Sequence, residues 1–197
     1  MTDSSKTLNV LGISGSLRRD SYNTAALRVA RDNAPSDMNI EFADLSEIPL
    51  YNQDLRDEKV PAAVTKLVEQ IIAADALLFS TPEYNYSMPA VLKNAIDWVS
   101  REQPQPFAGK PAAIMSSSMS LLGGVRAQYD LRRSMVFLDV HCLNKPEVMI
   151  ASAHERFDEQ GRLTDEDTKA HINKMVVALG KWTRLLQAGK QFQAGDK

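Results

Sequence analysis

Three short polar segments, each directly after an apolar run, carry the residue types that could hold a small ligand. The first spans residues 15–23 and includes the cation Arg18 and the hydrogen-bonding side chains of Ser16, Ser21 and Asn23. Because a helical pattern begins at its end, a phosphate bound there would also meet the free N–H groups and partial positive charge of a helix start. The same residues would equally fit an ordinary turn, with Ser21 as a helix cap and Arg18 in solvent.

The second segment, residues 81–89, combines two prolines with large polar side chains. It places four of its residues in a row: Pro82, Glu83, Tyr84 and Asn85. The prolines fix the backbone φ angle, and a stiff turn with polar and aromatic groups suits a flat heterocycle, whose edge needs hydrogen bonds and whose face needs a wall. The alternative is a proline-bounded turn whose tyrosines pack against neighbouring elements.

The third segment, residues 116–124, consists of small hydroxyl residues followed by apolar residues and two glycines. Small side chains such as Ser117, together with the glycines, let a ligand approach the backbone closely. The alternative interpretation is a flexible serine loop that binds nothing.

The elements around these segments alternate between strand and helix. Short apolar runs predict five strands, at residues 8–14, 39–44, 76–81, 111–116 and 147–151. Helical periodicity predicts helices over residues 21–33, 61–74, 87–100, 124–138 and 165–186, with a frayed tail after them. This alternation favours an α/β fold, a flavodoxin-like three-layer sandwich around a five-stranded parallel sheet of order 2-1-3-4-5. In such a sheet ligands bind beyond the carboxyl ends of the strands, where the three segments would meet.

Composition excludes several classes of protein. The 197 residues suit a single domain over residues 1–197, with its core at about 8–186. The formal net charge of −2 lacks the basic footprint of a nucleic-acid binder. No apolar run approaches the ~20 residues that span a bilayer, and the polar start lacks a signal-peptide core, so we expect a cytoplasmic protein without membrane contact. Cys142 is the only cysteine, which excludes an intrachain disulfide and a multi-cysteine metal site, and no bound metal is expected.

Taken together, the three segments resemble one family, the NAD(P)H-dependent FMN reductases. The resemblance is carried by GSLRRDSYN (15–23), TPEYNYSMPAVLKNAIDWVSR (81–101) and SSSMSLLGGVRAQYDLR (116–132), and it extends from about residue 8 to 186. Within the family, these segments are most similar to the bacterial quinone and chromate reductase branch. The resemblance implies a flavodoxin-like fold that binds FMN noncovalently. It implies a 5′-phosphate held by Ser16, Arg18, Ser21 and Asn23, an isoalloxazine held by Pro82, Glu83, Tyr84 and Asn85, and Ser117 at the pyrimidine end of the ring or the ribityl chain.

The resemblance also implies an activity. NADPH or NADH would be the co-substrate, and a hydride would pass through FMN to a small-molecule oxidant by a ping-pong mechanism. The expected oxidants are quinones, and also flavin, chromate and azo compounds. No catalytic side chain is expected, because the flavin carries the chemistry. Two alternatives are a flavodoxin-type electron carrier, which the nearly balanced charge does not favour, and a non-catalytic flavin-binding protein.

The family further implies a homodimer or homotetramer with sites near subunit contacts. In the segment 124–138, Arg126 and Tyr129 would belong to such an interface, or the arginines would form a solvated face. Trp98 and Arg101, at the end of the preceding helix, would extend the same surface.

Overall fold

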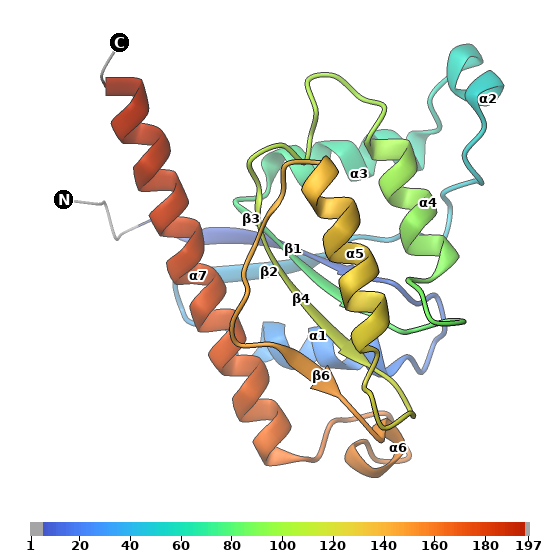
Figure 1. Ribbon diagram of the computed structural model, residues 1–197, viewed down its shortest axis with the longest axis vertical. Coiled ribbons are helices and arrows are strands. Elements are labelled where there is room, and N and C mark those ends of the chain that lie inside the picture. The colour runs from blue at the N-terminus through green and yellow to red at the C-terminus, as the bar shows by residue number, and fades with distance from the viewer. Residues whose placement is uncertain (1–5, 196–197) are drawn as a thin grey trace.

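The centre of the molecule is a parallel sheet, seen in a computed structural model that describes residues 6–195 (Figure 1). Its strands are β1 (Leu8–Ser14), β2 (Met38–Phe42), β3 (Ala76–Thr81), β4 (Pro111–Ser117), β5 (His141–Cys142) and β6 (Val148–Ile150). They pair in parallel in the order β2-β1-β3-β4-β5, and β6 also pairs with β4. The predicted flavodoxin-like order is confirmed.

The fifth strand is divided in two, which the sequence did not predict. β5 pairs with the start of β4, whereas β6 pairs with its end, from Met115 onward. Between the two pieces the chain leaves the sheet, and Pro146 in this stretch has no N–H to donate to a ladder. The predicted strand at residues 147–151 therefore corresponds to β6, while the two residues of β5 are too few to give a periodic signal.

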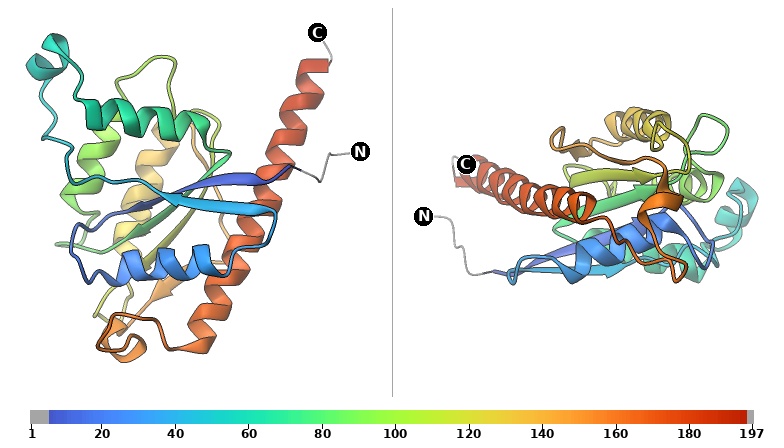
Figure 2. Two further views of the ribbon diagram at one scale, coloured as in Figure 1. Left: turned by 180° about the vertical axis from the view of Figure 1, so that it is seen from behind. Right: turned by 90° about the horizontal axis from the view of Figure 1, so that it is seen from below.

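Helices cover both faces of the sheet (Figure 2). They are α1 (Tyr22–Asp32), α2 (Gln53–Glu58), α3 (Ala62–Ala73), α4 (Ala90–Val99), α5 (Val125–Phe137), α6 (Ala153–Arg156) and α7 (Glu166–Gly195). Alternate residues of β1 point to opposite faces, as the pleat of a strand requires. Leu8 and Val10 pack in the core cluster with α1 and α7, while Leu11 and Ile13 pack with α3, α4 and α5. The predicted three-layer sandwich is confirmed.

Helix α7 is longer than the sequence indicated. It continues to Gly195, so the predicted frayed tail from residue 187 is wrong for the described residues, and residues 196–197 lie outside them. Two side chains from this stretch hydrogen-bond to residues just before β3 and β4. Gln187 Nε2 donates to Asp75 Oδ1 (2.9 Å), and Lys190 Nζ donates to the carbonyl of Gly109 (3.0 Å). Neither α7 nor any other helix among residues 6–195 combines the length and the apolarity needed to cross a bilayer.

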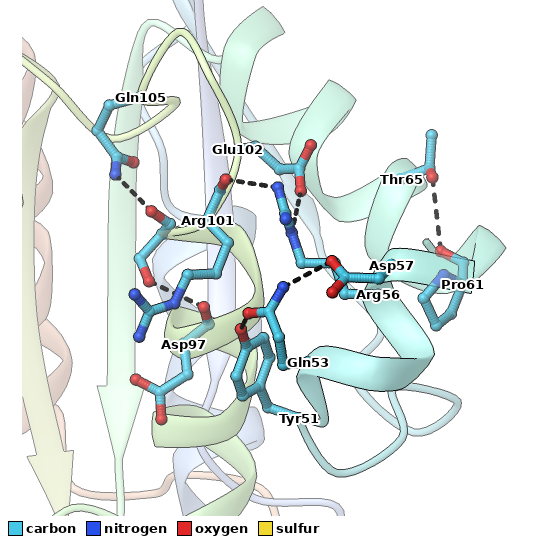
Figure 3. Close-up of polar contacts among 11 residues, drawn as sticks. Tyr51, Gln53, Arg56, Asp57, Pro61, Thr65, Asp97, Arg101, Glu102 and Gln105 are labelled. Atoms are coloured by element: carbon cyan, nitrogen blue, oxygen red, sulfur yellow. Dashed lines mark hydrogen bonds and ion pairs between the residues drawn. The ribbon is translucent and has the colours of Figure 1, made fainter. Parts of the chain in front are cut away.

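The connection from β2 to α3 runs along α4 and carries the short helix α2, which the sequence did not predict. Arg56 of α2 donates through Nη2 to the carbonyl of Arg101 (2.9 Å), and its Nε lies 3.4 Å from Glu102 Oε1 (Figure 3). Trp98 is fully buried beneath this connection, and its indole N–H donates to the carbonyl of Pro49 (2.8 Å). The expectation that Trp98 belongs to an exposed surface is therefore wrong.

The start of α7 is held by one carboxylate. Asp165 Oδ1 accepts hydrogen bonds from the Thr168 hydroxyl, from Thr168 N (2.9 Å) and from Arg156 Nη1 (2.8 Å). These bonds, those from Thr168 above all, hold the pKa of Asp165 below its ordinary value of 3.8. The carboxylate thus acts as a helix cap in its charged form.

Asp165→Ala should lower the free energy of unfolding by about 1 kcal/mol at neutral pH, as the loss of a helix cap does. Because the pKa of Asp165 is lower in the folded than in the unfolded chain, this contribution is present above the unfolded value and is lost as the pH falls through the folded one. Urea unfolding of both proteins over a pH series measures it, with Asp167→Ala as a control in the same helical turn. A difference at neutral pH that persists at pH 2 would contradict the assignment.

Candidate functional site

The three polar segments meet at one edge of the sheet because β1, β3 and β4 end side by side. Ser14 lies beside Ser80 and Thr81 lies beside Ser116 in the strand register. A cleft of about 260 Å³ opens beyond these ends. It is lined by eight of the predicted site residues, Ser16, Arg18, Ser21, Asn23, Pro82, Glu83, Tyr84 and Ser117, together with Tyr22, Ser118 and Met119. The remaining predicted residue, Asn85, does not line it.

Gly15 allows the first two segments to pack against each other. A Cβ at this position would lie 3.0 Å from Pro89 Cγ and 3.1 Å from Pro82 Cδ. The Gly15 N–H also donates to the carbonyl of Ser80 (2.8 Å), which carries the pairing of β1 and β3 one residue further. The glycine therefore brings the segment with the cation next to the segment with the aromatic side chains.

The first segment ends in a capped helix start that faces the cleft. Ser21 is buried, and its Oγ accepts from Thr24 N (3.3 Å) as the cap of α1, so the capping role considered from the sequence is confirmed. Ser21 also lines the cleft together with Tyr22, the first residue of α1. Arg18 is exposed at the rim, where its guanidinium lies 5.2 Å from the centroid of the Tyr22 ring. The cation and the helix start thus face the same end of the cleft.

Asn23 is placed differently from the other residues of its segment. Its side chain is buried, with 3% of its surface exposed. Oδ1 accepts from Ser117 N (2.9 Å) and from Ser80 Oγ (3.1 Å), while Nδ2 donates to the carbonyl of Ser117 (3.0 Å). Both ends of the amide are therefore engaged within the protein, between α1 and the ends of β3 and β4.

The second segment forms a tight turn at the tip of β3. Tyr84 and Ser87 exchange two backbone hydrogen bonds of 3.0 Å. The two residues between them, Asn85 and Tyr86, have φ angles of 50° and 69°, the pattern of a type I′ turn. Within the described part of the chain, no acceptor takes up the N–H groups of Glu83 and Asn85. Asn85 is exposed at the turn, which explains why its side chain stays out of the cleft.

Arg126 ties this turn to α5. Its Nε lies 2.6 Å from Glu83 Oε1, and its backbone N–H donates to Glu83 Oε2 (3.1 Å). The carboxylate thereby satisfies a free N–H at the start of α5, where Gly124 has no side chain to do so. The guanidinium also lies 3.6 Å from the centroid of the Tyr86 ring.

The solvated face considered for the arginines is therefore wrong for Arg126, while the subunit interface remains a prediction. Sequence reasoning missed this pair because Glu83 and Arg126 are 43 residues apart and neither position has a local signal for the contact. The one hint in the sequence is that Gly124, directly before a helical pattern, offers no capping side chain.

The third segment is fixed to the sheet and is not the flexible loop considered as the alternative. Ser118 N donates to the carbonyl of Ile150 (3.0 Å), and Ser116 Oγ donates to the carbonyl of Gly123 (2.5 Å). Gly123 has a φ of 58°, and a Cβ there would lie 2.9 Å from the carbonyl carbon of Met149. The loop therefore packs so closely on the end of β6 that only glycine fits.

Ser117 supplies the polar atom that the protein itself leaves unsatisfied. Its Oγ is buried and has no hydrogen-bond partner among the described residues, although the residue lines the cleft. Buried hydroxyl groups are normally hydrogen-bonded, and an unpaired one costs free energy. A ligand with a polar atom at this point would supply the missing partner, which is what a bound FMN offers along its ribityl chain and ring.

The charged and nucleophilic groups elsewhere in the chain lie apart from the cleft. None of the three histidines lines it. Cys142 is half-buried on β5, where desolvation raises the pKa of its thiol. In the part of the chain that the structure describes, no three His, Cys, Asp or Glu side chains gather into a group that could hold a metal ion. Arg18 and the Glu83–Arg126 pair are thus the charged groups at the site.

A parallel sheet of this order, with a cleft at its carboxyl edge, is the architecture in which flavodoxin-like proteins hold FMN. The family model described as NADPH-dependent FMN reductase matches residues 8–155, and the chain belongs to this family.

Individual relatives agree with this assignment. The chain is 59% identical over 180 residues to an NAD(P)H-dependent FMN reductase of Pseudomonas aeruginosa, covering 91% of this chain and 97% of the relative. It is 44% identical over 181 residues to a quinone reductase of Escherichia coli, covering 90% and 96%. Among solved structures, FerB, a flavoenzyme NAD(P)H:(acceptor) oxidoreductase of Paracoccus denitrificans, matches with a TM-score of 0.82 and 33% identity over 90% of this chain and 97% of that chain. The predicted family, its quinone reductase branch, the oxidoreductase class and the FMN and NAD(P)H cofactors are confirmed.

Arg126→Ala should destabilise the apoprotein, because it leaves the largely buried Glu83 carboxylate without its charged partner. Loss of a hydrogen bond to a charged group predicts a fall of about 1.5–3 kcal/mol in the free energy of unfolding, measured by urea denaturation. Arg133→Ala, on the same helix but 82% exposed, is the matched control and should change it by less than about 0.5 kcal/mol. Equal effects of the two substitutions would show that the Glu83 contact contributes nothing.

Proposed function

We propose that the protein is an FMN-dependent NAD(P)H oxidoreductase that reduces quinones and other small oxidants. The observation that carries this proposal is the cleft itself, which is lined by Arg18, the start of α1, the turn after β3 and Ser117. Among the described residues, the Ser117 hydroxyl and the N–H groups of Glu83 and Asn85 have no hydrogen-bond partner. Two relatives support it, since one is named a quinone reductase and another an NAD(P)H:(acceptor) oxidoreductase.

The residues divide between the two ends of FMN. Ser16, Arg18 and the first N–H groups of α1, which Ser21 caps, would hold the 5′-phosphate, because an anion is stabilised by charge-assisted hydrogen bonds at a helix start.

At the other end, Pro82, Glu83, Tyr84 and the backbone of Asn85 would hold the isoalloxazine. The ring edge would accept from the N–H groups of Glu83 and Asn85, which have no acceptor within the described chain. Ser117 Oγ would bind the pyrimidine end of the ring or the ribityl chain.

When bound, FMN supplies the redox chemistry, taking a hydride from NAD(P)H and passing two electrons, with protons, to a quinone that leaves as the hydroquinone. The protein contributes the walls of the substrate position. Tyr84 and Met119 line the cleft and are 52% and 62% exposed, so they flank its opening. We further propose that the nicotinamide and the oxidant share one position beside the ring, so that the nicotinamide would leave before the oxidant binds, in a ping-pong mechanism. Flavin, chromate and azo compounds are further proposed oxidants.

The remaining features of the proposal concern the whole molecule. We propose that residues 1–197 form one cytoplasmic domain that assembles as a homodimer or homotetramer. Exposed apolar side chains along α5, namely Tyr129, Val136 and Phe137, support such an assembly.

Turnover with a quinone and no partner protein tests the function. The purified protein with FMN should oxidise NADPH or NADH when 1,4-benzoquinone is added, with parallel lines in double-reciprocal plots. An FMN-loaded protein without turnover would instead be a non-catalytic flavin binder, and turnover that requires a second protein would indicate an electron carrier. Intersecting lines would reject the ping-pong mechanism alone.

Arg18→Ala should weaken FMN binding, because the phosphate loses a charge-assisted hydrogen bond worth about 1.5–3 kcal/mol. The dissociation constant of FMN should rise about 10- to 100-fold in a fluorescence titration of the apoprotein. Arg19→Ala removes the neighbouring exposed cation, which does not line the cleft, and is the control. An unchanged affinity in Arg18→Ala, or the same loss in both variants, would refute the phosphate contact.

A further inference from the structure

We propose that Asn23 is a positioning residue that aims the Ser117 hydroxyl into the cleft, and that it is not a ligand of the phosphate. This inference rests on the proposed function, because it assigns Ser117 Oγ to bound FMN. From the sequence, Asn23 is placed among the side chains expected to bind the phosphate. In the structure its amide hydrogen-bonds to the backbone of Ser117 at the end of β4.

The position of Asn23 is explained by where the ladder between β3 and β4 stops. The last pair in that register is Thr81 with Ser116. β3 ends at Thr81, and Ser117, one residue further along β4, has no partner residue in this register.

The carboxamide of Asn23 replaces the missing strand. It accepts from Ser117 N (2.9 Å) and donates to Ser117 O (3.0 Å), so it pairs both backbone groups of one residue as a neighbouring peptide chain would. On the other side, Ile150 of β6 is the register partner of Ser117, and its carbonyl accepts from the next residue, Ser118 N (3.0 Å). The end of β4 at Ser117 is thereby held from both sides.

The hydrogen-bond partners of Asn23 allow its amide one orientation. The Ser80 hydroxyl donates to Asn23 Oδ1 (3.1 Å), and all three residues of this group, Asn23, Ser80 and Ser117, are at least 96% buried. A rotated amide would place Nδ2 against the N–H of Ser117, two donors facing each other without water. The oxygen therefore faces Ser117 N, and the pairing has one geometry.

The two hydrogen bonds from Asn23 also direct the hydroxyl of Ser117. With the backbone fixed at its N–H and its carbonyl, the Cα–Cβ bond of Ser117 has one direction. Its Oγ is buried and has no protein partner in the described chain. Because Asn23 stands on the first turn of α1, the same residue also couples the helix start to the third segment. Asn23 thus acts on the ligand through Ser117.

Riboflavin, which lacks the phosphate, separates this role from a phosphate contact. The dissociation constants of FMN and riboflavin are measured by flavin fluorescence for the apoprotein of the parent chain, Asn23→Ala, Ser117→Ala and the double variant. Asn23→Ala should weaken both ligands by a similar factor, about fivefold to tenfold for one lost hydrogen bond. The double variant should be no weaker than Asn23→Ala alone, because the hydroxyl is already misdirected. Arg18→Ala is the contrasting control and should weaken FMN much more than riboflavin.

Thr183→Ala is the control for a structural effect, because it removes a buried hydrogen bond to Leu179 on α7, outside the cleft. It should lower the free energy of unfolding and leave both affinities unchanged. If Asn23→Ala does not fold, Ser80→Ala keeps the amide and removes one hydrogen bond to its oxygen, and it should weaken both ligands in the same ratio.

Three results would overturn the assignment: an Asn23→Ala protein that loses FMN affinity but keeps riboflavin affinity, losses that multiply in the double variant, or unchanged affinities. If Ser80→Ala is measured in place of Asn23→Ala, the same three results for that variant would overturn the assignment. A parent chain that binds neither flavin would instead refute the proposed function, and this inference with it.

Discussion

The site depends on one constraint, that every buried backbone N–H and carbonyl needs a hydrogen-bond partner. Strands β1, β3 and β4 end together at the edge of the sheet, and the register of β3 with β4 stops at Thr81 and Ser116. Partners must therefore come from elsewhere. The amide of Asn23 satisfies Ser117, and the carboxylate of Glu83 satisfies an N–H of α5. The first contact joins the first segment to the third, and the second joins the second segment to α5, which directly follows the third.

The groups that remain unpaired then define the ligand. Among the described residues at the cleft, they are the Ser117 hydroxyl, the N–H groups of Glu83 and Asn85, and the start of α1 beside Arg18. An anion suits the helix start, and a flat ring with acceptors along its edge suits the turn. FMN combines both in one molecule. In the proposed complex the protein would thus position the cofactor with its own unsatisfied polar groups, and Arg126 compensates the charge of Glu83 beside them.

Local signals in the sequence predicted the sheet and the composition of the cleft. The apolar runs of β1 and β3 have the predicted bounds, and loops that follow neighbouring parallel strands must share an edge. The contacts of Asn23 and Arg126 could not be predicted, because each joins residues far apart in the chain and depends on how a helix is rotated on the sheet. The extension of α7 was missed for a related reason, since Gln187 and Lys190 are anchored by tertiary contacts and not by periodicity.

Amide hydrogen exchange of the apoprotein, with and without saturating FMN, tests the central claim most directly. One ligand that spans the cleft should slow exchange at the start of α1, at residues 83–87 and at residues 116–120 together. The amides of α2, whose residues do not line the cleft, should keep their rates. Protection confined to one of the three segments, or absent from all of them, would contradict the account.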